Sequence, residues 1–338
     1  MSAVDLDALV ATLRAGRGFA HKRDIADVMT ALARALPGGA ADLAQAVAVG
    51  DDCAAIADAH GEGWLLFAIE GFLDDFVQAM PWFAGYCGVM VNVSDICAMG
   101  GRPIAVVDAL WSRGTEGANE VLAGLAAAST RYGVPIVGGH SNNHSERGQL
   151  AVAILGRARQ LLTSFAARPG DTLMMAIDLR GAYEEPHPFW NASTGAPAQR
   201  LRADIELLPA LAESGLCDAA KDISNAGAIG TALMLVECSK VGAVIDVAAI
   251  PRPPGVPLAR WLQSFPSFGF VFSVRPRHVA AVRAHFEAAD IACARVGQVT
   301  AEPQLWLRDG GRRALMWDLA AELFITAREP AMQEAGHV

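Results

Sequence analysis

The sequence lacks the patterns that mark several large classes of protein. It contains no run of about 18 uncharged apolar residues, so we expect no transmembrane helix. A net charge of −9 leaves no excess of basic side chains for a nucleic-acid surface. The six cysteines include no Cys-x-x-Cys pair, and we therefore expect reduced, mostly buried thiols rather than disulfides.

Familiar catalytic and cofactor motifs are also missing. There is no dinucleotide-binding glycine fingerprint, Walker A loop, His-Glu-x-x-His or Gly-x-Ser-x-Gly sequence. The N-terminal segment carries early acids and no apolar signal region, which favours a cytoplasmic protein. We expect no nucleic-acid or membrane partner. Anionic substrates remain compatible with the negative charge, because Mg²⁺ can bridge carboxylates to phosphates.

What the sequence does contain is enough apolar material for a sizeable core in two domains. It has 338 residues, of which 53% are hydrophobic and 19% charged. Apolar runs of strand length alternate with helical patterns up to about residue 160, and a join follows at 161–170. We predict an α/β fold with domains at 1–160 and 161–338. Residues 181–200 are expected to form a long loop, either a mobile lid or a segment docked on the domain surface.

Two short helices are expected near the N-terminus, at 5–15 and 24–36. Between them, His21, Lys22 and Arg23 form a basic run in an otherwise acidic protein. Such a run could hold a phosphate group. An exposed, solvated helix start is the more common role for this pattern.

A buried helix is predicted within residues 86–103, and it carries a carboxylate. Gly88, Asn92 and Asp95 point almost the same way at about 100° per residue. A carboxylate in a buried helix is costly unless it is paired or bound to a metal, and the helix itself supplies no Lys or Arg. Mg²⁺ is one natural partner. The alternative is a core helix whose Asn and Asp bond to local backbone, and the helix alone leaves both interpretations open.

Further acidic residues lie at a turn and at the end of a predicted strand. Asp51 and Asp52 follow Gly50 at a corner, where adjacent acids fit either an ordinary turn or a metal site. Glu70 follows the apolar run 64–69, and an acid at the end of a buried strand is a common site position in α/β folds.

A predicted long helix in the second half of the chain begins at another polar cluster. Ser224 or Asn225 is expected to cap it, and a helix N-terminus with free N–H groups attracts phosphate. Asp222, just before the helix, could hold a metal.

The pair Gly138 and Gly139 ends a short predicted strand and is followed by His140. Two glycines let the backbone approach a ligand closely, and the histidine could bind a metal or a phosphate. A lone histidine in a loop more often does neither, and both interpretations stay open.

Together and in order, these motifs become specific. They run Gly50-Asp51-Asp52-Cys53-Ala54, Glu70-Gly71, Asn92-Val-Ser-Asp95-Ile-Cys-Ala-Met-Gly100, Gly138-Gly139-His140, Gly156-Arg157-Ala158, Arg168-Pro-Gly-Asp171 and Lys221-Asp222-Ile223-Ser224-Asn225. From about residue 45 to 320, the chain resembles the superfamily of aminoimidazole ribonucleotide (AIR) synthetase, thiamine-monophosphate kinase, selenophosphate synthetase and the hydrogenase-maturation carbamoyl dehydratase. The likeness is closest to the uncharacterised AIR synthase-related proteins, including those found as methanogenesis markers.

The resemblance implies a two-domain α/β (α+β) fold. The N-terminal sheets of two subunits would close into a barrel across a homodimer, and the C-terminal domain would be an α/β sandwich. ATP and several Mg²⁺ ions would bind in a cleft lined by the motifs. The implied metal ligands are Asp51, Asp52, Glu70, Asp95 and Asp222. The implied nucleotide-binding positions are Gly50, Asn92, Gly138, Gly139, Arg157, Lys221 and Ser224, with Asn92 also supporting Asp95. His140 and Asn225 would take part in catalysis.

Three positions depart from the thiamine-monophosphate kinase pattern. Glu70, His140 and Asn225 stand where that family has aspartates. Losing two negative charges from the cleft favours fewer metals, so we expect an acceptor other than thiamine monophosphate. The predicted function is ATP- and Mg²⁺-dependent phosphoryl transfer to a small metabolite, through an acyl or imidoyl phosphate of a carboxylate or amide. The alternatives are a thiamine-monophosphate kinase-like enzyme and a non-catalytic nucleotide-binding or assembly subunit.

Overall fold

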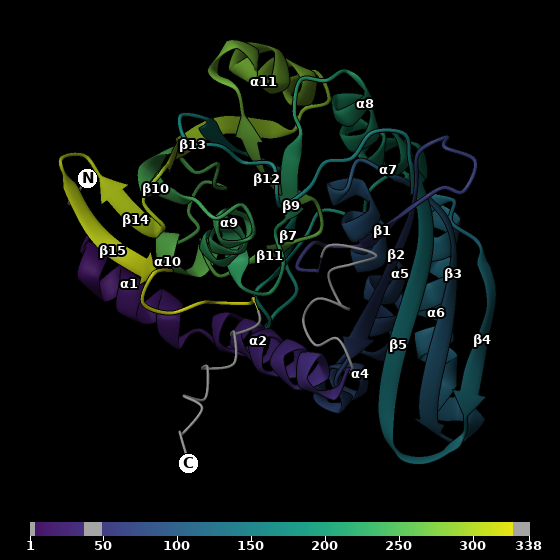
Figure 1. The fold of residues 1–338 in the computed structure, drawn as a ribbon. Coiled ribbons are helices and arrows are strands. Elements are labelled where there is room, and N and C mark those ends of the chain that lie inside the picture. Colours follow the sequence, from purple (N-terminus) through teal and green to yellow (C-terminus); the bar gives the residue numbers. More distant parts are fainter. Residues whose placement is uncertain (1–3, 37–48, 327–338) are drawn as a thin grey trace, which may run out of the picture.

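The computed structural model of the chain describes residues 4–36 and 49–326, which form two large β-sheets with helices packed against them, and a third, three-stranded sheet (Figure 1). The chain thus has the mixed α/β, two-domain organisation that the sequence predicted. Within the described part of the chain, no helix combines the length and the hydrophobicity that a membrane crossing requires. All six cysteines are free and buried, as expected.

The first sheet has five strands in the order β1-β2-β5-β3-β4. Strand β5 is antiparallel to both β2 and β3, and β3 and β4 are parallel because helix α6 carries the chain back between them. The strands are β1 (Ala54–Ala57), β2 (Trp64–Phe72), β3 (Arg102–Arg113), β4 (Ile136–Asn142) and β5 (His144–Ala158). Alternate residues of these strands face the helices and the open side, which is why Leu66 is fully buried and Phe67 is half exposed.

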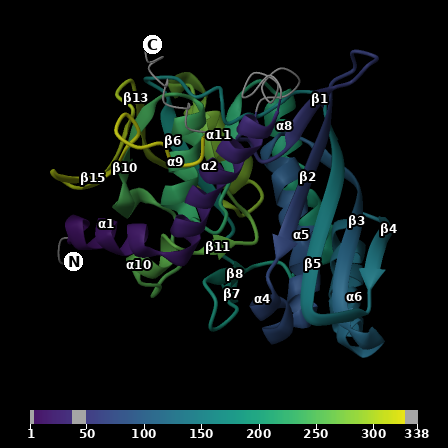
Figure 2. The same cartoon turned by 60° about the horizontal axis from the view of Figure 1, so that its bottom comes forward.

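In the described part of the chain, helices cover one face of this sheet and leave the other face without a helix (Figure 2). Helix α5 (Pro81–Ala98) packs against the sheet and against α6 (Gly114–Tyr132), and the short α4 (Asp74–Ala79) precedes it. Glycine permits the close approach of α5 to α6, since a Cβ at Gly85 or Gly124 would overlap the backbone of the facing helix. Helix α5 is therefore buried on nearly all sides, as its composition predicted.

The second sheet has seven strands in the order β15-β14-β10-β13-β6-β12-β9. They are β6 (Thr172–Ile177), β9 (Ala219–Asp222), β10 (Gly242–Asp246), β12 (Gly269–Val274), β13 (Ala292–Thr300), β14 (Gln304–Asp309) and β15 (Arg312–Asp318). The accompanying helices are α7 (Ala198–Ile205), α8 (Leu207–Glu213), α9 (Gly227–Cys238), α10 (Leu258–Trp261) and α11 (Val279–Glu287). Helix α9 begins at Gly227 with Ala226 at its N-cap, so the prediction that Ser224 or Asn225 caps it is wrong.

Of the two N-terminal helices, the first lies where the sequence predicted it, and the second differs from its predicted range. Helix α1 (Leu6–Ala15) packs on β15, and its apolar side chains join the core of the second sheet. Helix α2 (Arg17–Ala35) starts earlier than expected, so the basic run at 21–23 lies inside a helix rather than before one. It continues from α1 across the boundary between the two sheets (Figures 1 and 2). The domain boundary at residues 160/161 stays a prediction.

Residues 181–200 are docked on the protein rather than extended from it. They contain β7 (Ala182–Tyr183) and β8 (Phe189–Asn191), which form a small sheet with β11 (Phe265–Pro266). The aromatic ring of Trp190 is buried against Trp261, with 5.3 Å between ring centroids. Of the two interpretations of this segment, docking is the one that the structure has.

Candidate functional site

A cavity of about 410 Å³ lies where the two sheets and α2 meet, and acidic and basic side chains line it. The charged lining consists of Lys22, Asp51, Asp52, Glu70, Asp95, Lys221 and Asp222. Gly50, Ser224 and Asn225 line it as well. All five acidic residues that the resemblance implies as metal ligands therefore line one cleft.

Three carboxylates converge inside this cleft. Asp52 lies at the corner before β1, Asp95 in the last turn of α5 and Asp222 at the end of β9. One oxygen of each lies within 4.8 Å of the others. A single divalent cation can contact side chains that converge this closely, and carboxylate oxygens are ligands that Mg²⁺ prefers.

Burial makes this cluster electrostatically unfavourable when it holds no cation. Burial, and then the nearby Asp222 and Glu70, raise the pKa of Asp95 well above its usual range. Burial and the adjacent Asp52 raise the pKa of Asp222 to about 8. One oxygen of Asp222, Oδ2, is buried without a hydrogen-bond partner. Unpaired buried carboxylate oxygens are costly, so the cluster is suited to a bound cation.

Lys221 holds Asp52 rather than facing the cleft as a free cation. Its Nζ lies 2.5 Å from Oδ1 of Asp52, and both side chains are buried. The backbone N–H of Asp222 donates to the other oxygen of Asp52 at 3.2 Å. Two consecutive residues of β9 thereby fix a carboxylate that belongs to the first half of the chain. A direct nucleotide contact by Lys221 stays a prediction.

Asp51 points away from the three-carboxylate cluster. Its two oxygens accept hydrogen bonds from the backbone N–H and the hydroxyl of Ser164, at 2.9 and 2.6 Å. Burial raises its pKa to about 6. These bonds anchor the Gly50-Asp51-Asp52 corner to the segment that joins the two sheets, and they favour a positioning role for Asp51 over metal binding.

Asn92 is fully buried and bonds to backbone, which is the simpler of the two interpretations of its helix. Its Nδ2 donates to the carbonyl of Gly88 at 2.7 Å and to that of Val152 in β5 at 3.0 Å. It therefore joins α5 to the first sheet. The structure shows no hydrogen bond between Asn92 and Asp95 among its described residues, although the two lie on the same helix.

The remaining predicted residues lie outside the cleft of this single chain. Arg157 pairs with Asp58 at 2.9 Å and Glu62 at 3.4 Å on an exposed surface. Gly138, Gly139 and His140 lie in β4, the strand at the opposite edge of the first sheet from β1, and all three are exposed. Their roles in nucleotide binding and catalysis stay predictions.

Lys22 is the charged group of the cleft that the site prediction missed. It lies in α2, and its positive charge partly offsets the burial that raises the pKa values of Glu70, Asp95 and Asp222. The basic run at 21–23 was a signal for it. Arg23, by contrast, turns away and pairs with Glu322 at 2.5 Å.

Comparison with known families matches both halves of the chain. Residues 50–158 match the AIR synthase related protein N-terminal domain, and residues 173–309 match the corresponding C-terminal domain. The chain belongs to the AIR synthase-related family. The expected likeness to this superfamily is confirmed.

Among individual relatives of this AIR synthase-related protein, an uncharacterised protein of Synechocystis sp. is 47% identical over 312 residues, covering 92% of this chain and 95% of the relative. An uncharacterised protein of Methanocaldococcus jannaschii is 35% identical over 244 residues, covering 71% and 75%. The thiamine-monophosphate kinase of Rhodopirellula baltica is 26% identical over 239 residues, covering 66% and 71%. The superfamily thus contains phosphoryl-transfer enzymes.

Solved structures confirm the fold. Thermotoga maritima PurL complexed with ATP superposes with a TM-score of 0.65 at 21% identity, over 79% of this chain and 45% of PurL. AaThiL complexed with AMPPCP and TMP gives a TM-score of 0.63 at 19% identity, over 81% and 93%. At this level of identity the likeness shows the architecture alone.

Proposed function

We propose that this protein is a Mg²⁺-dependent enzyme that transfers a phosphoryl group from ATP to a small metabolite. The observation that carries the proposal is the convergence of Asp52, Asp95 and Asp222 in a cleft, with one buried oxygen of Asp222 left without a partner. Two solved structures of the same fold contain ATP or AMPPCP, and one relative is a kinase. These likenesses support the assignment of the nucleotide to the same cleft.

The chemistry of the three carboxylates fits Mg²⁺ better than a softer metal. All the ligand atoms are oxygens, and no cysteine or histidine belongs to the cluster. Asp52, Asp95 and Asp222 would hold the ion, with Glu70 at the border of the cleft as a further oxygen ligand. Bound there, Mg²⁺ would offset the negative charge of the phosphates during transfer.

The chain's own residues would then position the reactants. Lys221 keeps the carboxylate of Asp52 oriented through its short ion pair. Lys22 supplies positive charge on the α2 side of the cleft, and Ser224 and Asn225 offer polar groups before α9. An oxygen of the acceptor attacks the terminal phosphorus of ATP, the bond from that phosphorus to the bridging oxygen breaks, and ADP leaves. A carboxylate or amide oxygen as the nucleophile would give the acyl or imidoyl phosphate expected from the sequence.

Calorimetric titration with ATP tests the proposal. We expect ATP to bind in the presence of Mg²⁺ and to bind far more weakly in EDTA. Asp95→Asn should abolish the metal dependence, whereas Glu287→Gln, an exposed acid paired with Arg283 in α11, should behave like the parent protein. Equal ATP affinity of the parent protein in Mg²⁺ and in EDTA would remove the basis of the assignment. So would an Asp95→Asn variant with the ATP affinity and metal dependence of the parent protein. Mg²⁺-dependent binding without turnover of ATP, for any acceptor tried, would favour a nucleotide-binding subunit.

The lack of activity on thiamine monophosphate stays a prediction. Of the two substitutions on which it rests, only Asn225 lies in the cleft of this chain. Asn225 lines the cleft, so its missing charge still bears on the metal site. His140 lies in β4, away from the carboxylates of its own chain. Incubation with ATP, Mg²⁺ and thiamine monophosphate should give no diphosphate product, and efficient conversion would show the prediction to be wrong.

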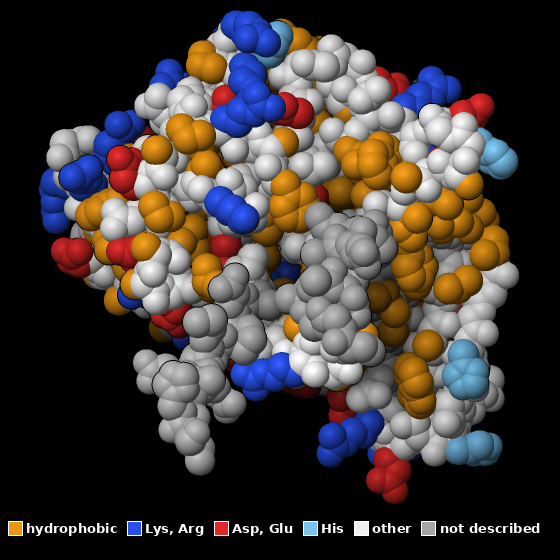
Figure 3. Space-filling model, viewed as in Figure 1, with side chains coloured by type: hydrophobic (Ala, Val, Ile, Leu, Met, Phe, Trp, Pro, Cys, Tyr) orange, Lys and Arg blue, Asp and Glu red, His pale blue; other side chains and the backbone are white. Residues whose placement is uncertain are grey.

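We also propose that the protein is a homodimer joined through the first sheet. The face of this sheet that lacks helices carries large apolar side chains, and Figure 3 shows hydrophobic side chains gathered over these strands. The exposed residues of this face are Phe67, Ile69, Ile104, Val107, Val137 and Leu155. A second copy would cover them and complete the barrel that the resemblance implies. Light scattering should give twice the chain mass of 35.5 kDa, and a monomer at micromolar concentration would refute the dimer.

A further inference from the structure

A second cavity, of about 460 Å³, lies directly beside the carboxylate cleft, and Glu70 and Asn225 line both cavities. We propose that this second cavity binds the acceptor, and that the acceptor is a planar ring with an anionic substituent. We call the cavity the aromatic chamber, after its lining by Phe72, Phe76, Phe83, His187, Phe189 and Phe265. The proposal rests on the proposed phosphoryl transfer at the neighbouring carboxylates.

The rings of the chamber are arranged to receive another ring. His187 and Phe189 stack at 5.1 Å with an interplanar angle of 15°. Phe76 meets both edge-on, at 5.7 Å from His187 and 5.3 Å from Phe189. All three rings are only half-buried, so part of each ring surface is accessible to a ligand. Aromatic groups bind one another in such offset and edge-to-face geometries, which favours a flat, unsaturated ligand.

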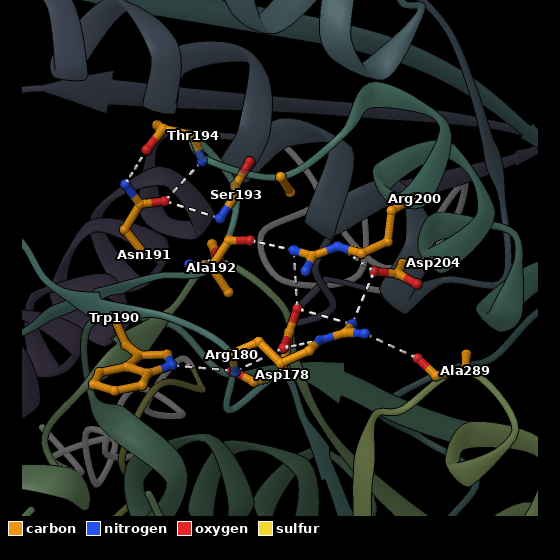
Figure 4. Close-up of polar contacts among 12 residues, drawn as sticks. Asp178, Arg180, Trp190, Asn191, Ala192, Ser193, Thr194, Arg200, Asp204 and Ala289 are labelled. Atoms are coloured by element: carbon orange, nitrogen blue, oxygen red, sulfur yellow. Dashed lines mark hydrogen bonds and ion pairs between the residues drawn. The ribbon is translucent and has the colours of Figure 1, made fainter.

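The residues that directly follow Phe189 in the sequence hold this wall of the chamber in place through hydrogen bonds (Figure 4). The indole N–H of Trp190 donates to the carbonyl of Asp178 at 3.0 Å. Oδ1 of Asn191 accepts from two backbone N–H groups that follow it, at 2.9 and 3.0 Å. Because this wall is already ordered before a ligand binds, binding loses little conformational entropy of the protein.

The wall is also tied to the second domain through charged side chains (Figure 4). Arg180 bonds to the buried carboxylates of Asp178, at 2.8 Å, and Asp204, at 3.3 Å. Arg200 approaches the same two carboxylates, at 3.4 and 3.6 Å. These pairs lie on both sides of 181–197 in the sequence, so they fix the two ends of the segment that carries the aromatic wall.

Positive charge reaches the chamber from α2. Arg17 and His21 line it, one turn apart on the same helix. Arg17 pairs with Asp75 at 3.7 Å, and both side chains are more than 70% exposed, so the pair contributes little stability. Among the described residues, His21 has neither a hydrogen bond nor an ion pair. An anionic group of a ligand would find both side chains accessible.

The order of groups along the two cavities sets the orientation of the acceptor. Arg17 and His21 line only the chamber, Lys22 lines only the carboxylate cleft, and Glu70 and Asn225 lie at the border. A ring in the chamber with its anionic substituent on Arg17 and His21 can turn a second substituent toward Glu70 and Asn225. The oxygen that accepts the phosphoryl group would belong to that second substituent.

Binding of three small probes tests the chamber directly. Benzoate has a ring and a charge, cyclohexanecarboxylate has the charge without the aromatic ring, and benzamide has the ring without the charge. In ligand-detected NMR titrations we expect benzoate to bind about threefold to tenfold more tightly than cyclohexanecarboxylate, as aromatic pairs do. Phe189→Ala should abolish this preference, whereas Phe165→Ala, an exposed aromatic outside the chamber, should keep it.

A second variant separates charge from ring and does not depend on a buried side chain. Arg17→Ala should weaken benzoate severalfold and leave benzamide unchanged. Equal affinity for benzoate and cyclohexanecarboxylate in the parent protein, or an undiminished preference in Phe189→Ala, would overturn the proposal. Titration of the same samples with Mg²⁺ and ATP distinguishes the two hypotheses. For the parent protein, failure to bind Mg²⁺-ATP while benzoate still binds counts against the proposed function, and failure to bind benzoate while Mg²⁺-ATP still binds counts against the chamber.

Discussion

The two cavities that share Glu70 and Asn225 are lined by different kinds of side chain. In the carboxylate cleft, the functional groups are buried, like-charged and fixed by hydrogen bonds from β9 and the Gly50-Asp51-Asp52 corner. In the aromatic chamber, they are half-buried rings that touch one another and leave one side open. The same helix, α2, supplies cations to both.

This difference separates two energetic tasks. The carboxylate cleft is unfavourable by itself and gains stability when a cation binds, so its chemistry depends on charge. The chamber gains from apolar contact and ring geometry, so its selectivity depends on shape. Substitutions in one cavity should therefore change properties that substitutions in the other leave alone, except where both depend on α2.

The largest expected effect is a loss of stability when the buried ammonium group of Lys221 is removed. Lys221→Met leaves the carboxylate of Asp52 buried, unpaired and beside other acids. Breaking a buried ion pair in this way costs about 3–5 kcal/mol. We expect the free energy of unfolding, measured with urea in EDTA, to fall by this amount.

The double variant is the control for this prediction. Replacing both partners, as Lys221→Met with Asp52→Asn, removes the uncompensated charge and should restore most of the lost stability. If the single variant is as stable as the parent protein, the Lys221–Asp52 pair does not hold the carboxylate cleft together as we infer.

A substitution in α2 should affect both cavities together. A Cβ at Gly18 would overlap the carbonyl oxygen of Asn225, so Gly18→Ala must displace the helix or the loop before α9. We expect a loss of about 1–3 kcal/mol in stability, as overpacking costs, and weaker binding of both benzoate and Mg²⁺-ATP. Gly117→Ala in α6 is the matched control. Its nearest neighbour would lie at 3.9 Å, and the change should leave stability the same or slightly higher.

The direction in which stability changes with pH should report on the buried carboxylates of the cleft. The pKa of Asp222 is raised to about 8, so between about pH 4 and 8 the folded chain keeps a proton that the unfolded chain has lost. Stability without metal must therefore fall as pH rises through this range. We expect a Tm in EDTA that is a few degrees lower at pH 8.5 than at pH 6.

Mg²⁺ and a single substitution check the origin of that dependence. The ion should raise the Tm more at pH 8.5, where the carboxylates are ionised, than at pH 6. Asp222→Asn should remove most of the pH dependence while leaving the aromatic chamber able to bind benzoate. A Tm that does not change with pH or Mg²⁺ would contradict the assignment of the cluster as a cation site.

The carboxylate cleft could be predicted from the sequence because its residues lie in short local motifs. Asp52, Asp95 and Asp222 each stand out against apolar surroundings, and their family order places them together. The two-domain α/β fold followed from apolar runs and helical periodicity. The sequence prediction went wrong where local patterns compete: the basic run at 21–23 is typical of an exposed helix start, but it lies within α2.

The aromatic chamber could not be predicted in this way. Its rings come from β2, α4, α5, the turn between β7 and β8, β8 itself and β11, and no single stretch contains enough of them to form a pattern. In the sequence, Phe189 is one aromatic residue of the segment 181–200, which could be either a mobile lid or a docked segment. In the structure the segment 181–200 is docked on the protein, and this docking places the ring of Phe189 in the chamber. The aromatic chamber forms only through contacts between segments that lie far apart in the sequence.

The smallest expected effect concerns the two residues predicted to act in catalysis. Asn225 borders both cavities, so Asn225→Ala should weaken Mg²⁺-ATP or acceptor binding by about 1 kcal/mol, the typical value of one hydrogen bond. His140 lies in the exposed edge strand β4, so His140→Ala should change nucleotide affinity by less than about twofold. Calorimetry on both variants measures the difference. A larger loss in His140→Ala than in Asn225→Ala would mean that a cleft within one chain is incomplete, and that β4 of a second chain contributes to it. The same titrations at concentrations where light scattering shows only monomer would then separate a direct contact by His140 from an effect through dimer formation.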